Sequence, residues 1–192
     1  MRIKYFVSRA LCKLYSRLRV ILYHLLSDVG IPFRCCEQPV IFKGVGKIKV
    51  SENVSFGVES SPEFFSSYSY IEARDSSSRV VIGENCKFNN SLSIVAFQSK
   101  IELGSDCLVG RSVELISSDF HDLNPSNRFS PKTIKSKDII IKNNVFIGNG
   151  VRILKGVTIG ENSIISAGSV VTKSCKENSI IAGNPAKLIG TL

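Results

Sequence analysis

The sequence is informative first for what it lacks. Its six cysteines form no CxxC pair, and without an export signal a chain of 192 residues is expected to keep its thiols reduced. The longest uncharged stretch of the N-terminal segment lies between Arg19 and Asp28 and has eight residues. That is too short to cross a bilayer or to form the apolar region of a signal peptide. These absences predict a cytoplasmic protein.

Acidic residues are missing from the first 27 positions, which contain six of the 25 lysines and arginines. The six bases are Arg2, Lys4, Arg9, Lys13, Arg17 and Arg19. The whole chain has a formal charge of +9, so the rest of it carries only +3. A nucleic-acid-binding domain is expected to spread a basic stripe over its folded surface. A body so close to charge balance therefore argues against a nucleic-acid partner.

The N-terminal segment has the period of an amphipathic helix. Arg9, Lys13 and Arg17 follow one another at a spacing of four, on a different face from the aliphatic residues. The aliphatic positions are Ile3, Val7, Leu11, Leu14, Leu18, Leu22 and Leu25. We expect residues 1–31 to form this basic helix, with its end near Pro32. Its leucine face packs either on the rest of the fold or on a partner subunit, or residues 1–27 lie on a membrane surface with their bases at anionic headgroups.

From Ile82 onward the sequence repeats with a period of six. Large apolar residues stand six positions apart in three runs, and the fifth position of most hexads is small or β-branched. The runs are Ile82, Phe88 and Ile94; Leu103, Val109 and Leu115; and Ile141, Ile147, Ile153, Ile159, Ile165 and Val171. Residues 40–60 show a fainter version. This period fits neither an α-helix nor an alternating strand.

A repeat of six with one large and one small inward residue predicts a prism of short parallel strands. Each hexad supplies one strand and its turn, and three hexads complete one coil, so the chain returns to the same face after every third hexad. Glycine and asparagine at the corners provide the tight bends. Cys86, Cys107 and Cys175 fall at the fifth hexad position, where we expect small core fillers.

Two stretches carry a family resemblance, namely IIIKNNVFIGNGVRILKGVTIGENSIISAGSVVTKS and the later IIAGNPAKLIG. They resemble the hexapeptide-repeat acyltransferases, especially the maltose and galactoside O-acetyltransferases and their relatives in capsule, exopolysaccharide and lipopolysaccharide assembly. The resemblance covers residues 80–190. It implies an all-β domain over residues 32–192, a left-handed parallel β-helix that follows the N-terminal amphipathic α-helix. It also implies a homotrimer with active sites between neighbouring subunits.

The repeat is interrupted between Leu115 and Ile141. The intervening segment contains two prolines and several serines and asparagines, so residues 116–138 are expected to leave the prism as a loop. This loop contains His121. A lone loop histidine is usually a solvated surface residue, but in the family that the chain resembles a histidine in this loop is the general base. The resemblance implies that His121 takes the proton of a sugar hydroxyl as that oxygen attacks the thioester of acetyl-CoA.

Two further residues are expected near His121. A catalytic imidazole needs a hydrogen-bond acceptor on its other ring nitrogen, and Asp119 is expected to orient the ring in this way or to bind substrate. Asn90 stands where the family has an asparagine near the site, so we expect it to contact substrate. For both residues the alternative is a turn-capping side chain that bonds within its own loop.

The resemblance also implies a site for acetyl-CoA and no metal requirement. Backbone N–H groups near Phe146 to Gly148 would stabilise the oxyanion, and we count both residues in the cofactor site. Asn149 would line the pantetheine channel, and the backbone of Ala167 and Gly168 would meet the pantetheine amides. The residues toward the nucleotide end are Thr172, Lys173, Pro185 and Lys187.

The sequence thus predicts an acetyl-CoA-dependent O-acetyltransferase acting on a sugar hydroxyl of a surface polysaccharide or of its lipid-linked precursor. Two alternatives stay open, an amino-sugar N-acetyltransferase and a non-catalytic β-helix scaffold. The γ-type carbonic anhydrases share the prism, but they need three histidines for zinc and this chain has two.

Overall fold

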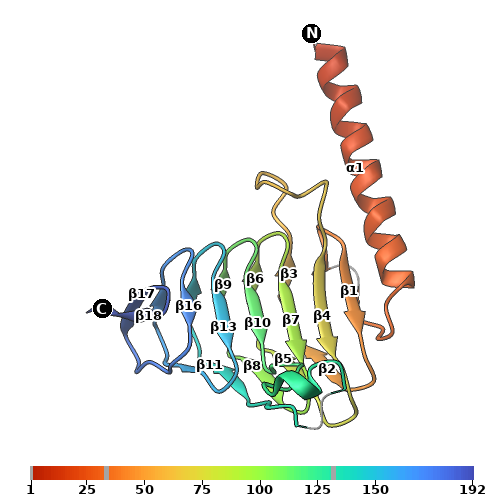
Figure 1. The fold of residues 1–192 in the computed structure, drawn as a ribbon. Helices are drawn as coiled ribbons and strands as arrows, with labels where there is room; N and C mark the ends of the chain where they lie inside the picture. Colours follow the sequence, from red (N-terminus) through yellow and green to blue (C-terminus); the bar gives the residue numbers. More distant parts are fainter. Residues whose placement is uncertain (1, 33–34, 131–132) are drawn as a thin grey trace.

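A helix and a three-sided prism make up the fold (Figure 1). The computed structural model describes residues 2–32, 35–130 and 133–192, so Met1 of the predicted helix and positions 131–132 of the predicted loop lie outside the described residues. Helix α1 (Arg2–Leu25) lies at the end of the prism opposite the C-terminus. It ends before the predicted boundary near Pro32, because the chain turns there to meet the first strand: the N–H of Asp28 donates to the carbonyl oxygen of Phe42 at 2.8 Å.

Each side of the prism is a sheet in which strands from successive coils lie next to one another. The first sheet contains β1 (Val40–Lys43), β4 (Ser69–Ala73), β7 (Ser93–Ala96), β10 (Glu114–Ile116), β13 (Arg152–Leu154) and β16 (Val170–Val171). The second contains β2 (Lys47–Val50), β5 (Arg79–Ile82), β8 (Lys100–Leu103), β11 (Ile139–Ile141) and β14 (Thr158–Ile159). The third contains β3 (Ser55–Phe56), β6 (Lys87–Phe88), β9 (Leu108–Val109), β12 (Phe146–Ile147), β15 (Ile164–Ile165), β17 (Ser179–Gly183) and β18 (Ala186–Thr191). The pairing is parallel except for the antiparallel hairpin of β17 and β18.

The strand register confirms the parallel prism predicted from the hexads, and the fold with its N-terminal helix is the left-handed parallel β-helix that the resemblance implied. In the last coils Arg152 pairs with Val170, which stands three hexads later in the chain, as the prediction requires. In the middle coils Ser93 pairs with Glu114, so these coils are longer by half a hexad. The faint repeat of residues 40–60 is a true coil, because β1, β2 and β3 each pair with a strand of the next coil.

The large hexad residues form columns in the core. In the second sheet Ile82, Leu103, Ile141 and Ile159 stack from coil to coil and are each at most 3% exposed. Burial of such a column removes apolar surface from water at every coil, which stabilises the prism along its whole length. The third sheet repeats the arrangement with Phe88, Val109, Ile147 and Ile165.

Two of the predicted cysteine fillers lie in this core. The Cys86 thiol donates to the carbonyl oxygen of Gly104 at 3.1 Å, and the Cys107 thiol donates to that of Lys142 at 3.3 Å. The hydrogen bond with Cys86, together with burial, raises the pKa of Cys107 far above its usual range, so this thiol stays protonated. Cys175 is half-buried and packs against the margin of the core.

Asparagines turn the chain where the second sheet meets the third. Asn144, Asn162 and Asn178 adopt φ values of 54°, 59° and 57°, in the left-handed region that asparagine tolerates better than most residues. The side-chain amide of Asn144 donates to Asn162 at 2.9 Å, and that of Asn162 donates to Asn178 at 3.1 Å. These bonds tie neighbouring coils together at one edge.

Helix α1 packs on the prism through its polar side. Val20 is 3% exposed, and the Arg19 guanidinium donates to the carbonyl oxygens of Phe64, Phe65 and Ser67 at 3.2, 2.7 and 2.6 Å. The leucine-rich face points the other way and is exposed, so packing of that face on the chain's own fold is excluded. No helix in the described part of the chain is long and apolar enough to cross a membrane.

Candidate functional site

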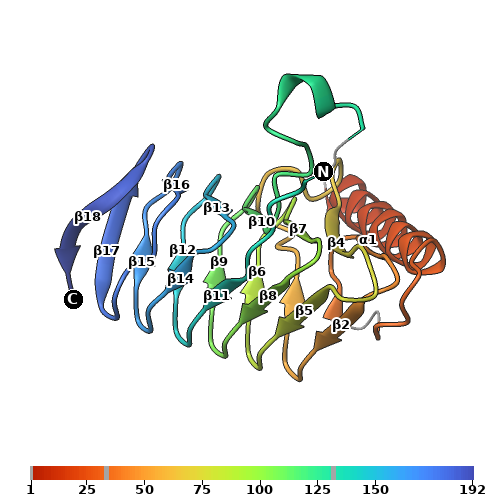
Figure 2. The ribbon, with the colours of Figure 1, turned by 60° about the horizontal axis from the view of Figure 1, so that its bottom comes forward.

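The predicted loop leaves the prism at the edge where the first sheet turns into the second, which we call the loop edge (residues 97–99, 117–138, 155–157 and 172–174). Figure 2 shows the loop as the teal segment that rises above the prism. Its two arms are joined at their base. The hydroxyl of Ser136 donates to that of Ser118 at 3.0 Å, and the N–H of Asp119 donates to the carbonyl oxygen of Lys135 at 3.1 Å. His121 therefore follows directly after a closed neck.

His121 is exposed on this loop, and its ring is held by one hydrogen bond. Nδ1 lies 3.1 Å from the carbonyl oxygen of Arg128. A carbonyl oxygen can only accept, so Nδ1 is the donor in this hydrogen bond, and in the neutral tautomer with this proton the lone pair lies on Nε2. This is the tautomer that a general base at Nε2 requires.

The rest of the loop is organised by its own polar side chains. Asp122 accepts from the N–H groups of Asn124 at 2.9 Å and Thr133 at 3.3 Å, which joins the two arms beyond His121. Asn124 in turn caps a short 3₁₀ helix, Pro125–Asn127, by accepting from the N–H of Ser126 at 3.1 Å. This is the mechanism by which Asx residues fix turns, and it gives the His121 segment a defined path.

Asp119 does not orient His121. Its carboxylate forms an ion pair with Lys155, which comes from the next turn of the loop edge. The orienting acceptor is the Arg128 carbonyl instead, because Asp119 lies at the neck and its side chain reaches back to the prism. Asp119 and Lys155 thus anchor the loop, and no sequence pattern marked Lys155 beyond its place in a hexad corner.

Phe120, directly before His121, adopts an unusual backbone conformation. Its φ is 58°, a region that bulky residues rarely occupy. Its ring lies 6.1 Å from that of Phe97, and the Arg74 guanidinium stands 4.6 Å from its centre. Arg74 is itself fixed by two hydrogen bonds to the buried Glu72, at 2.9 and 2.8 Å, which raise the pKa of Arg74. Sequence analysis missed this cluster, because its members are far apart in the chain.

Asn90 has a different role from the predicted substrate contact. It is fully buried, its Oδ1 accepts from the N–H of Val58 at 2.9 Å, and its Nδ2 donates to the carbonyl oxygens of Val58, Ser61 and Pro62. Every hydrogen-bonding atom of its side chain is used inside the protomer. Asn90 therefore holds the turn after β3, which lies in the preceding coil and not in its own loop as the alternative supposed, and no atom of this side chain is left to face a substrate.

The predicted pantetheine residues lie at the edge where the third sheet turns into the first, which we call the glycine edge (residues 110–113, 148–151 and 166–169). Gly148 is required there because a Cβ would stand 2.6 Å from the backbone nitrogen of Ala167 in the next coil. Asn149 accepts from the N–H of Arg111 at 2.9 Å. The N–H of Gly168 donates to the carbonyl oxygen of Asn149 at 2.8 Å, so this amide is used by the fold, whereas Ala167 is exposed.

The amides predicted to stabilise an oxyanion are also used by the fold. The N–H of Phe146 donates to the carbonyl oxygen of Ser163 at 3.0 Å, and that of Gly148 donates to that of Ile165 at 2.8 Å. The ladder between coils consumes both donors. The Phe146 ring projects outward from the third sheet and is 45% exposed. This residue therefore contributes a side chain to the surface but no free N–H donor.

The residues assigned to the nucleotide end lie in two places. Thr172 and Lys173 follow β16 at the loop edge, and Thr172 lines a cavity of about 430 Å³ together with Lys135, Lys137 and Lys155. Pro185 lies in the turn between β17 and β18, and Lys187 follows it within β18; both side chains are exposed. The cavity brings cationic side chains close to the neck of the histidine loop.

The structure thus divides the predicted site between two edges of the first sheet. Strand β16 separates Gly168 at the glycine edge from Thr172 at the loop edge. Four residues of extended chain span about 13 Å. In one protomer, His121 and the predicted pantetheine residues therefore lie at opposite edges of the first sheet. Within residues 2–32, 35–130 and 133–192, no three His, Cys, Asp or Glu side chains are grouped to hold a metal ion.

A prism of hexad coils with one long loop at an edge defines a hexapeptide-repeat β-helix. The family model described as bacterial transferase hexapeptide (six repeats) matches residues 138–173. Over these residues the chain carries the hexapeptide repeat of bacterial transferases, which agrees with the resemblance found in the sequence.

Several solved structures of acetyltransferases are similar to this chain. The polySia-specific acetyltransferase NeuO is 31% identical with a TM-score of 0.65, over 80% of this chain and 66% of that chain. This chain therefore spans just under two thirds of NeuO. The polysialic acid O-acetyltransferase OatWY is 26% identical with a TM-score of 0.63, over 81% of this chain and 71% of that one. A galactoside acetyltransferase in complex with coenzyme A, 24% identical with a TM-score of 0.56 over 93% and 80% of the two chains, shares the fold.

Proposed function

We propose that this chain is an acetyl-CoA-dependent O-acetyltransferase that acts on a sugar hydroxyl of a surface polysaccharide or of its lipid-linked precursor. The observation that carries the proposal is the exposed His121 ring, whose Nδ1 is held by the Arg128 carbonyl and whose Nε2 is the nitrogen left for a base. The similarity to NeuO and OatWY, which act on polysialic acid, supports a saccharide acceptor.

In the proposed reaction, acetyl-CoA supplies the acetyl group as an activated thioester. Nε2 of His121 accepts the proton of the acceptor hydroxyl while that oxygen bonds to the acyl carbon. The resulting imidazolium is stabilised through Nδ1 by the Arg128 carbonyl, and it returns the proton to the departing sulfur. The ester forms, the thioester bond breaks, and His121 is again neutral. No enzyme nucleophile is needed, and the buried thiols of Cys86 and Cys107 take no part.

The glycine edge offers a path along which an extended pantetheine could lie. At Gly150 and Gly168 no atom lies within 4 Å of where a Cβ would stand, and Ala167 is exposed beside them. The exposed cations Lys173 and Lys187 suit the phosphates at the nucleotide end. Two donors of the predicted site, at Gly148 and Gly168, are already used by the fold, so binding would depend on the surface shape and on the cations.

We propose a homotrimer because the two halves of the site lie on opposite edges of the first sheet. In a ring of three prisms, the loop edge of one subunit can stand beside the glycine edge of the next, which would bring His121 to a cofactor held by its neighbour. The proposal also places the protein in the cytoplasm, at the inner face of the membrane where lipid-linked sugars are built.

The proposed function is tested by acetyl transfer from acetyl-CoA to the native polysaccharide, followed by thiol release and by mass spectrometry of the product. His121→Ala should lower kcat by about 10²- to 10⁴-fold, the usual contribution of a general base. His24→Ala removes the other histidine, on α1, and is the matched control that should keep its activity. Full activity of His121→Ala at an unchanged melting temperature would overturn the assignment of the base.

The same product identifies the acceptor atom. Mild alkali removes an O-acetyl ester from the sugar but leaves an N-acetyl amide in place. We expect alkali-labile acetyl groups. Alkali-stable acetyl groups would establish an amino-sugar N-acetyltransferase, and no transfer to any saccharide by the native protein would favour a scaffold.

A further inference from the structure

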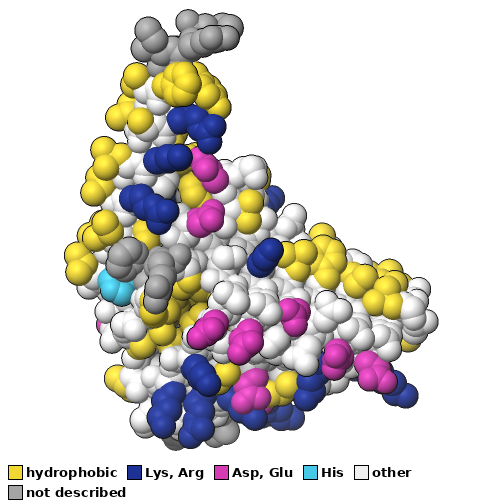
Figure 3. Space-filling view, turned by 180° about the vertical axis from the view of Figure 1, so that it is seen from behind, with side chains coloured by type: hydrophobic (Ala, Val, Ile, Leu, Met, Phe, Trp, Pro, Cys, Tyr) yellow, Lys and Arg dark blue, Asp and Glu magenta, His cyan; other side chains and the backbone are white. Residues whose placement is uncertain are grey.

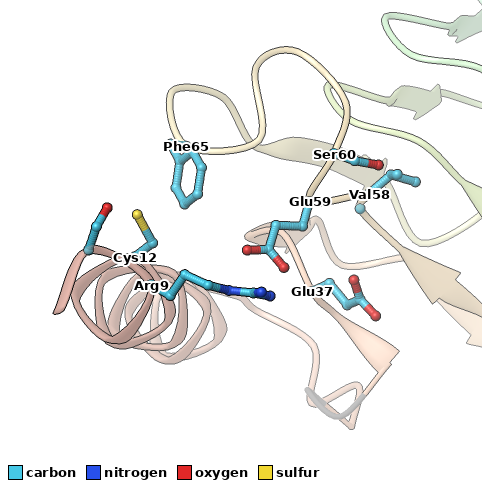
Figure 4. A pocket seen from close by; sticks show the side chains of 9 residues that line it. Arg9, Cys12, Glu37, Val58, Glu59, Ser60 and Phe65 are labelled. Atoms are coloured by element: carbon cyan, nitrogen blue, oxygen red, sulfur yellow. The ribbon is translucent and has the colours of Figure 1, made fainter. Parts of the chain in front are cut away.

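One face of helix α1 lies toward the prism, and the opposite face is exposed. Its inner face meets the turn after β3, where Arg9 and Cys12 line a cavity of about 750 Å³ together with Glu37, Glu59 and Phe65. Figure 4 shows the Arg9 side chain extending toward the two glutamates, Glu37 and Glu59. The inner side of the helix thus carries Arg19, which is bonded to the prism, and Arg9, which faces acidic side chains across this cavity.

The outer face is a continuous apolar surface. Leu11, Leu14, Leu18, Leu22 and Leu25 recur at helical spacing and are 61%, 58%, 57%, 52% and 74% exposed. Val7 and Ile21 extend the same face. From Val7 to Leu25 it is about 27 Å long at 1.5 Å per residue. Contiguous apolar surfaces of this kind are uncommon on monomeric proteins and mark contact sites.

Three further bases with described side chains lie beside this apolar face. Lys4, Lys13 and Arg17 are exposed, and the sequence of the helix contains no acidic residue. Figure 3 shows apolar side chains along the side of the helix away from the prism, with basic side chains beside them. An apolar face bordered by lysine and arginine matches the two layers of a membrane surface, acyl chains beneath anionic headgroups.

The direction in which this apolar face points indicates what kind of partner can cover it. Figure 1 shows the C-terminal part of α1 beside β1, at the end of the prism opposite the C-terminus, and its N-terminal part extending beyond the prism. A face opposite the packed side thus looks away from the prism along its length. Prisms that assemble side by side, as in the proposed trimer, would leave their ends uncovered, and three such faces would lie in one plane.

We propose that α1 is a membrane-surface anchor whose leucine face (Val7, Leu11, Leu14, Leu18, Ile21, Leu22 and Leu25) inserts into an anionic lipid surface. The helix lies in the plane of the interface and does not cross the bilayer. Its inner face stays on the prism, so docking needs no unfolding of α1. The coplanar arrangement rests on the proposed trimer, whereas the insertion of a single helix does not.

The test is flotation of the full-length protein with phosphatidylcholine vesicles that contain either none or about 30% phosphatidylglycerol. Native protein should float with the anionic vesicles, and 0.5 M salt should weaken this binding severalfold. Leu14→Glu/Leu18→Glu should reduce binding at least tenfold. Val45→Glu/Leu192→Glu adds the same two charges at exposed apolar positions away from α1 and should bind as the native protein does. Lys13→Gln/Arg17→Gln should lose the preference for anionic vesicles.

Two results would overturn the proposal. One is equal flotation of native protein and Leu14→Glu/Leu18→Glu. The other is absence of native binding combined with a smaller oligomer for Leu14→Glu/Leu18→Glu in light scattering, which would show that a second copy covers the face. Acetyl transfer to a soluble saccharide should be unchanged in Leu14→Glu/Leu18→Glu, so failure of the anchor and failure of the proposed function give different results.

Discussion

The two edges of the first sheet make turns between short strands in different ways. At the glycine edge every turn from residues 110–113 onward is closed in four residues and bonded to the next coil, as when Gly168 donates to Asn149. At the loop edge, residues 117–138 leave the prism as a long loop. The Ser118–Ser136 neck and the loop's own polar side chains hold it in place. The regular edge is stabilised by repetition. The irregular one is free to carry chemistry because the prism does not depend on it.

Removal of an aliphatic side chain is expected to lower the free energy of unfolding far more in the prism than in the loop. Ile153→Ala in β13 empties a fully buried position and should lower the free energy of unfolding by about 3–4 kcal/mol. Leu123→Ala removes a similar side chain that is 66% exposed on the loop and should change it by less than about 0.5 kcal/mol. Denaturant unfolding of both variants measures the contrast. Equal losses would mean that the loop is packed as part of the core.

Replacement of two asparagines, one in the prism and one in the loop, is expected to give a smaller difference in stability. Asn90→Ala leaves the N–H of Val58 and nearby carbonyl groups without partners and should cost about 2–3 kcal/mol of stability. Asn124→Ala removes only the exposed cap of the short loop helix and should cost about 0.5–1 kcal/mol. Thermal unfolding compares them. If folded Asn90→Ala instead showed a raised KM for the acceptor and native stability, Asn90 would be a substrate contact after all.

The anchor of the loop should affect turnover more than stability. Lys155→Met breaks the ion pair with Asp119 and should lower kcat about tenfold through misplacement of His121, since small displacements of a catalytic group are costly. Arg152→Met breaks the neighbouring ion pair with Glu114, which is exposed, and should leave kcat unchanged. Both melting temperatures should stay within a few degrees of native. A native kcat in Lys155→Met would show that the neck alone positions the loop.

The hexads predicted the prism because the six-residue period depends only on which side chains face inward. Ile147 and Ile165, for example, are in contact through strands that the period itself specifies. The loop was found as a break in that period, and His121 within it. The position of Asp119 was not predictable in the same way, since its partner Lys155 lies in another coil. The Phe120 cluster combines side chains from three separate turns, and no local pattern marks such a meeting.

The N-terminal helix gives a similar lesson about faces. The period of residues 1–25 indicated two faces correctly, but it did not indicate which one meets the prism. The structure buries Val20 and leaves Leu18 exposed, because Arg19 finds carbonyl acceptors on the turn after β3. Polar contacts with a distant segment decided the orientation of an otherwise apolar pattern.

The strand register across the loop has a consequence for how this protein can change. Glu114 pairs with Arg152 and Ile101 with Ile139, although the whole loop lies between the members of each pair. These strands nevertheless meet in the same parallel register as Arg152 and Val170, where the coil has only three hexads. The loop thus leaves the strand register between the coils unchanged. Because each doubling of a loop costs only about 0.6 kcal/mol in closure entropy, segments of other lengths could be exchanged at this point. The loop can therefore differ in length and sequence without a redesign of the core.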